Sequence, residues 1–344
     1  MKKISTLALT SVLFLVANQT IAQNLIAVQN GNSPRFFQQV DDAIVNAVEG
    51  DTLYIPGGSW NLTQHINKRL HLIGVGHHPD STKVTFSSKI LSAVYLDSGA
   101  SNGSITGINI QGQIFAQTEV NYYTVKRCRI FGVYILTNSS NFSFIENVID
   151  GMVTVNYRVI ATNFTFFNNI LSASFSFSFD TILSCTNSIF KNNIFLFNSF
   201  CSWGCALSVT GNFSLFENNV FFNTNNLGGV YNSTLRNNIF VEGISFDNTT
   251  KVGSNNLIGQ SQAGIFVNQS GNTFDYSHDY HLQPNSPGKN AGTDGTDIGI
   301  YGGIYPWKEG SIPSNPHFQS IQIAPKTDTN DNLNVKIKVA AQDH

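Results

Sequence analysis

A six-residue motif recurs through the middle of the chain and limits the folds that the chain can adopt. Six copies align without gaps, and five of them have asparagine at the fourth position. These fourth residues follow one another at intervals of 19, 22, 24, 26 and 19 residues. The copies begin at Val125, Phe144, Phe166, Phe190, Phe216 and Leu235. A unit of this length, with apolar–polar alternation and turns rich in Asn, Gly and Ser, is too short for a helix pair and predicts stacked strands.

Three columns of the aligned motif predict the inside of the stack. The first and sixth positions are apolar in every copy, so we expect two ladders of side chains in the interior. The fourth position holds Asn147, Asn169, Asn193, Asn219 and Asn238. A lone buried amide costs about 1–3 kcal/mol, whereas stacked amides bond to one another along the axis. We interpret this Asn ladder as a structural feature of a turn at which asparagine adopts left-handed backbone, and not as a binding site.

Segments on both sides of the repeat have the features of caps for such a stack. Apolar residues between Phe36 and Val48 recur at helical spacing, Gly50 stands at the expected C′ position, and a strand, a Pro-Gly-Gly turn and another strand follow. This opening resembles the pectate-lyase-like right-handed β-helix family, and residues 280–303 resemble the terminal coil of its secreted bacterial members. The resemblance spans about residues 27–303. It implies an all-β fold: a single-stranded right-handed parallel β-helix with an N-terminal capping helix and a short C-terminal β tail.

This interpretation divides the chain into four segments. Residues 1–22 have the two lysines, the apolar run and the small residues before the cleavage point that are typical of a signal peptide. Residues 23–58 form the cap and first strands, 59–303 the β-helix, and 304–344 a tail with two short strands. The apolar run is shorter than the ~20 residues that cross a bilayer, and no later run is long and apolar enough. We expect a protein without a transmembrane segment that is secreted, periplasmic or held at the cell surface.

The charge of the chain restricts its partners. Charged residues make up 12% of the sequence, about half of the usual ~25%, and the formal net charge is -2. Proteins that bind nucleic acid present a basic surface to the phosphates, which this composition does not supply. We therefore expect no nucleic acid, and instead a polysaccharide or a cell-surface glycan as the partner.

One column of the motif carries charges on three consecutive coils. Two places before the Asn ladder stand Lys191, Glu217 and Arg236, which point outward if the first column points inward. They form either a surface salt ladder, worth about 0–1 kcal/mol per pair, or a cationic site for a sugar acid with Lys191 or Arg236 as base or clamp. The family resemblance implies a Lys or Arg base with Ca²⁺ on clustered carboxylates in lyases, and several Asp residues on adjacent coils in hydrolases. Neither set of carboxylates is evident in the repeat, so we expect no cofactor, and Ca²⁺ only for a lyase.

Tryptophan, cysteine and histidine supply further candidates. Trp203 lies between Cys201 and Cys205 in the longest unit. It is either a platform on which a sugar stacks or a side chain packed on its own coil, and a disulfide between the two cysteines would close a small loop. The His-His-Pro-Asp run at residues 77–80 has the residue types of a metal site. A polar turn explains this run more simply, so we expect no metal.

The column that follows the Asn ladder predicts an exposed apolar stripe. Alternation places this column outward, and five of its six members are aliphatic. The members are Arg129, Val148, Ile170, Ile194, Val220 and Ile239. Because exposed stripes usually mark an interface, we expect the tail, residues 305–344, to lie along this stripe or an adjacent face and to cover it.

The function that these observations favour is binding. The scaffold is strongly specified by the repeat, whereas no complete catalytic set is recognisable. We expect an exported β-helix protein that binds polysaccharide or a surface partner. The alternative is a polysaccharide lyase that acts on uronate-containing glycans through Lys191, Glu217 and Arg236; a glycoside hydrolase is disfavoured because the required Asp residues are missing from the repeat.

Overall fold

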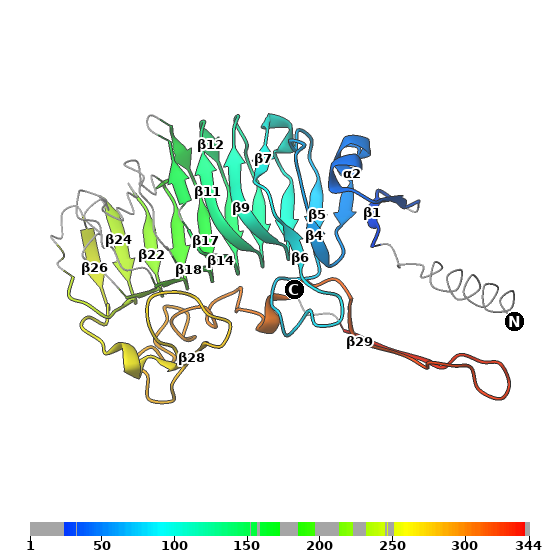
Figure 1. The fold of residues 1–344 in the computed structure, drawn as a ribbon. Helices are drawn as coiled ribbons and strands as arrows, with labels where there is room; N and C mark the ends of the chain where they lie inside the picture. Colours follow the sequence, from blue (N-terminus) through cyan, green and yellow to red (C-terminus); the bar gives the residue numbers. More distant parts are fainter. Residues whose placement is uncertain are drawn as a thin grey trace, which may run out of the picture.

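The chain winds into a parallel β-helix whose coils stack along one axis (Figure 1). The computed structural model describes residues 24–31, 33–151, 153–156, 159–172, 185–196, 213–222, 232–244, 246 and 251–340. The predicted signal peptide, residues 1–22, and Trp203 with its two flanking cysteines lie outside the described residues. The fold predicted from the repeat, an all-β right-handed parallel β-helix with an N-terminal capping helix and a β tail, is confirmed. Within the described ranges, no helix is long and apolar enough to cross a membrane.

Two long sheets form the walls of the coil. The first sheet has the order β2-β1-β3-β5-β8-β10-β13-β17-β20-β22-β24-β26, and the second runs from β4 to β25. The strands of the first are β1 (Ile26–Gln29), β2 (Arg35–Phe37), β3 (Thr52–Tyr54), β5 (His71–Ile73), β8 (Ser104–Thr106), β10 (Thr124–Lys126), β13 (Ser143–Ile145), β17 (Thr165–Phe167), β20 (Ile189–Lys191), β22 (Leu215–Glu217), β24 (Ser233–Arg236) and β26 (Lys251–Ser254). The strands of the second are β4 (Gly58–Trp60), β6 (Ser88–Ile90), β9 (Asn109–Ala116), β11 (Arg129–Ile135), β14 (Val148–Ile149), β18 (Ile170–Leu171), β21 (Ile194–Phe195), β23 (Val220–Phe221) and β25 (Ile239–Phe240), with β7 (Val94–Leu96) and β15 (Val153–Val155) beside them.

Shorter elements complete the described chain. A third sheet contains β12, β16 and β19, and two antiparallel pairs, β27–β28 and β29–β30, follow the coils. Their bounds are β12 (Ser139–Ser140), β16 (Ala161–Thr162), β19 (Cys185–Thr186), β27 (Phe266–Asn268), β28 (Asp279–Leu282), β29 (His317–Ile323) and β30 (Val335–Ala340). The helical elements are α2 (Val40–Asn46) and the short 3₁₀ turns η1 (Ser98–Ala100), η3 (Gln262–Gly264) and η4 (Glu309–Ser311).

Stacked phenylalanine rings fill the interior of the later coils. The first motif position supplies a stack in which successive ring centroids are 4.8, 4.8 and 4.6 Å apart. The rings are those of Phe144, Phe166, Phe190 and Phe216. The sixth position supplies a second stack, of Phe195, Phe221 and Phe240. All of these side chains are buried, because the repeat period brings identical positions into register one coil apart.

The Asn ladder closes the turn between the two long sheets. The Oδ1 atom of Asn169 accepts from the backbone N–H of Asn147 at 2.9 Å and from its Nδ2 at 3.0 Å, and the same pair of bonds recurs down the ladder as far as Asn256. Left-handed backbone occurs one residue earlier than we expected, with φ of 56° at Asn168 and 58° at Asn192. The ladder amide must point into the coil, so the residue before it turns the chain and directs its own side chain outward.

The N-terminal cap differs in detail from the prediction. Helix α2 begins at Val40, because Phe36 and Phe37 belong to strand β2. The helix ends near Ala47, which has extended backbone, so Gly50 lies beyond the C′ position that the sequence suggested. Val40 and other apolar residues of the helix are buried over the first coil and cover its open end.

Residues 265–316, here called the strap, run back along the outside of the coils toward the N-terminal end. The residues that precede the Asn ladder donate to backbone carbonyls of the strap in reverse coil order. These bonds join Asn237 Nδ2 to Ala291 O, Asn192 Nδ2 to Gly299 O, Asn168 Nδ2 to Gly302 O and Arg127 Nη1 to Ile312 O, at 2.9, 3.1, 2.7 and 3.0 Å. The prediction that residues 280–303 form a terminal coil is therefore wrong, since this segment lies across several coils instead of extending the stack.

The strap also covers the apolar stripe that follows the Asn ladder. The stripe faces outward as predicted, and its five aliphatic members are fully buried. Ile265, Leu282 and Ile298 of the strap pack in one cluster with them from Ile170 to Ile239. The prediction that the tail covers the stripe is wrong for the two strands on which it was based, because β29 and β30 form a hairpin that projects past the N-terminal end of the coils (Figure 1). From residues 305–344, Trp307 packs against the cluster that contains the stripe.

Candidate functional site

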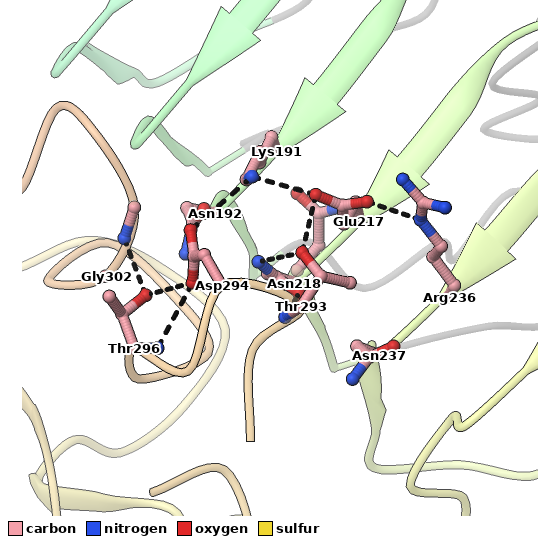
Figure 2. A network of polar contacts seen from close by, with 12 residues as sticks. Lys191, Asn192, Glu217, Asn218, Arg236, Asn237, Thr293, Asp294, Thr296 and Gly302 are labelled. Carbon is pink, nitrogen blue, oxygen red and sulfur yellow. Dashed lines mark hydrogen bonds and ion pairs between the residues drawn. The ribbon is translucent and has the colours of Figure 1, made fainter. Parts of the chain in front are cut away.

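The charged column brings its three predicted members together. Residues Lys191, Glu217 and Arg236 end strands β20, β22 and β24, and their Cα atoms are direct partners in the sheet. Glu217 stands between the two cations: its Oε1 lies 2.8 Å from Lys191 Nζ, and its Oε2 accepts from Arg236 Nε (Figure 2). The side chain of Glu217 is 4% exposed, whereas those of Lys191 and Arg236 are 21% and 46% exposed.

The strap supplies the remaining partners of this column. Thr293 Oγ1 donates to Glu217 Oε1 at 2.7 Å, and Asp294 Oδ2 lies 3.5 Å from Lys191 Nζ (Figure 2). Asp294 is held in turn by Thr296, whose backbone N–H and hydroxyl both donate to its Oδ1. Lys191, Glu217 and Arg236 of the column and Thr293, Asp294 and Thr296 of the strap thus form one polar network on the outside of the coil, which we call the lock.

Electrostatics in the lock favour an ionised Glu217. Burial alone raises the pKa of Glu217, but hydrogen bonds from Lys191, Thr293 and Arg236 outweigh it, and the pKa lies below the ordinary value. Lys191 already pairs with the carboxylates of Glu217 and Asp294. If Lys191 acted as a base, it would have to be neutral, and the buried Glu217 would lose one of its cationic partners. A substrate carboxylate would also have to compete with Glu217 for both cations. The arrangement is suited to holding the strap and poorly suited to proton abstraction.

A stack of aromatic side chains on the strands of the second long sheet was not predicted from the sequence. Tyr95, Phe115 and Tyr134, on β7, β9 and β11, are stacked with centroids 5.2 Å apart, and His65 continues the stack at 4.8 Å from Tyr95. The residues on either side of each strand member are buried, so these rings face outward, and all four side chains retain solvent exposure. We call these four residues the aromatic ladder. Its signal in the sequence is the spacing of 20 and 19 residues between Tyr95, Phe115 and Tyr134, which matches the repeat.

A third cluster joins the loop after β5 to the strap. The predicted polar turn at residues 77–80 begins with a buried His77, whose Nδ1 lies 3.0 Å from Tyr276 Oη. The guanidinium of Arg129 lies 5.0 Å from the ring centroid of Tyr276 and pairs with Asp150 at 2.6 Å. Burial, and then the positive charges of Arg129 and His78, lower the pKa of His77 to about 3. Among the described residues, no group of three or more His, Cys, Asp or Glu side chains is placed to hold a metal ion.

Comparison with known proteins adds little to this description. No protein-family model matches the sequence, and no curated protein resembles it significantly. One solved structure, the crystal structure of pectate lyase Pel9A, aligns with a TM-score of 0.41 and 12% sequence identity, over 76% of this chain and 90% of that one. Similarity at this level says nothing of activity.

Proposed function

We propose that this is an exported protein that binds an extended polysaccharide along the aromatic ladder and performs no lyase chemistry at Lys191 and Arg236. The ladder carries the proposal. It forms a row of outward, stacked rings on successive coils, and the tyrosines add a hydroxyl to an apolar body, a combination enriched at binding surfaces. A polymer with regular units suits a surface whose own units repeat from coil to coil.

The rigidity of the ladder supports a binding role. The rings of Tyr95, Phe115 and Tyr134 belong to parallel strands whose neighbouring side chains are buried, so little conformational freedom remains to be lost there when a ligand binds. The ladder also has polar neighbours, since His65 Nδ1 lies 3.2 Å from Asp97 Oδ2 beside the first ring. Apolar contact and hydrogen bonding to sugar hydroxyls are therefore available on the same face.

Substitution of the ladder tests the proposal. Each ring contributes roughly 1 kcal/mol of contact, so we expect Tyr95→Ala and Tyr134→Ala each to weaken polysaccharide binding about fivefold. Binding is measured by calorimetry and affinity electrophoresis on a panel of neutral and uronate polysaccharides. Tyr122→Asn is the matched control, because Tyr122 is 61% exposed on another corner where most coils have Asn. Ladder variants that bind every polysaccharide as the wild type does would contradict the proposal.

The same panel decides the lyase alternative. The protein is incubated with uronate polysaccharides, with and without Ca²⁺, and the absorbance of unsaturated products is followed. We expect no product, because the charged column is bound to the strap. Product formation that is abolished by Lys191→Ala or Arg236→Ala would replace the binding proposal with a lyase.

A further inference from the structure

The C-terminal hairpin, strands β29 and β30, has two unlike faces. Cross-strand partners on one face are Phe318–Val339, Ile321–Ile337 and Ile323–Val335, and on the other Ser320–Lys338 and Gln322–Lys336. The six side chains of the first face, here called the hairpin face, are apolar and between 43% and 61% exposed. Alternation of this strictness is the pattern of a sheet that covers something apolar.

Nothing in the described chain covers the hairpin face. In the sheet arrangement, β29 and β30 pair with each other and with no other described strand, and the hairpin projects past the N-terminal end of the coils (Figure 1). An isolated two-stranded hairpin is marginally stable in water, and contiguous exposed apolar patches mark interfaces. We therefore expect another apolar surface to cover the hairpin face.

A complementary apolar surface lies at the same end of the molecule. Phe36 on β2 and Val45 and Val48 on the cap are 60%, 58% and 55% exposed, and we call them the cap patch. Strand β2 is also the open edge of the twelve-stranded sheet, so its outer backbone groups are available to another strand.

The base of the hairpin lies beside β1, the strand that pairs with β2 and its Phe36. Pro313 and Pro316 line a hollow of about 210 Å³ together with Leu25, which precedes β1, and Tyr54 of β3. The hairpin then extends past the cap and does not fold over it (Figure 1). Both surfaces of a contact are thus present at one end of the molecule, but a single copy does not bring them together.

We propose that a second copy of this chain completes the contact, with each hairpin face seated on the partner's cap patch. A hairpin of this size offers on the order of a few hundred Å² of apolar surface. A stable interface needs about 800 Å² per partner, and two reciprocal contacts around a twofold axis double the area of one. Such an interface is isologous and closed, so it yields a dimer and no longer chain.

The test uses three matched double variants of the full chain. The hairpin variant is Ile321→Glu with Ile337→Glu, and the control is Ser320→Glu with Gln322→Glu, which adds the same charge to the opposite face. The cap variant is Phe36→Glu with Val45→Glu. Mass is measured by light scattering and sedimentation over a concentration series, and circular dichroism confirms the coil in each variant. Where a Glu variant loses the coil signal, Ser takes its place.

The proposal predicts a specific pattern of masses. We expect the wild type and the control at twice the monomer mass, and the hairpin and cap variants at the monomer mass. A mixture of the hairpin and cap variants regains one intact contact and associates, more weakly than the wild type. The proposal is overturned by a monomeric wild type, by a cap variant that remains dimeric (in which case hairpins meet each other), or by a mixture that does not associate.

Discussion

At the scale of single residues, the side chain before the fourth position of each motif copy, which is Cys128 or a ladder asparagine, determines how a coil binds the strap. Asparagine is the usual choice, because it tolerates a positive φ and its amide reaches backbone carbonyls. Arg127 and Glu146 replace it on two neighbouring coils, both with positive φ, and their side chains pair at 2.6 Å in an almost fully buried position. Arg127 also donates to Ile312 O, so the ion pair performs on these coils the task that amides perform on later ones.

His77 makes the stability of the protein depend on pH. Its folded pKa of about 3 lies below the value near 6.5 of an unfolded histidine, so in this window the unfolded chain binds a proton that the folded chain does not. Stability is therefore complete above pH 6.5 and falls on acidification, by about 2 kcal/mol at pH 5 from this group. The free energy of unfolding in urea at pH 7.5 and pH 5 measures the difference.

A substitution assigns this pH dependence to one side chain. We expect His77→Gln to remove about 2 kcal/mol of the difference between the two pH values. His65→Gln is the control, because the side chain of His65 is 42% exposed on the outer face. An unchanged pH dependence in His77→Gln would show that His77 is protonated in the folded state, contrary to its burial.

At the scale of elements, the lock around Glu217 joins three strands to the strap. Glu217→Gln leaves the volume unchanged but removes the anion that Lys191 and Arg236 share, so we expect a loss of about 3 kcal/mol in the free energy of unfolding. Hydrogen exchange should rise first in the strap around residues 290–300. Asp80→Asn is the matched control, since the Asp80–Lys83 pair is more than two-thirds exposed and its loss should leave the free energy of unfolding almost unchanged. Equal losses in the two variants would mean that the strap does not depend on the lock.

At the scale of the whole molecule, the sequence was sufficient to predict the coils and insufficient to predict the strap that packs on their outer surface. The columns headed by Phe144 and Asn147 predict burial, because apolar or amide side chains that recur at the repeat period stack on one another in the interior of the coils. The sequence predicts a coil at residues 280–303, because the coils hold this segment through its own backbone carbonyls, such as Gly302 O, which leave no mark on the side-chain pattern. The members of the charged column were predicted correctly as neighbours, but Thr293 and Asp294 come from a distant segment with no motif of its own.

The strap changes how such a repeat protein comes apart. In a simple solenoid each unit contacts only its neighbours, so the end units can fray while the middle persists. Here the segment that leaves the last coil returns across the earlier ones and is tied to them from Asn237 to Arg127, so opening either end disturbs contacts along much of the stack. The strap thus links coils that are not adjacent in the stack, in addition to the contacts between nearest neighbours. We therefore expect the structure to unfold in one cooperative step instead of coil by coil.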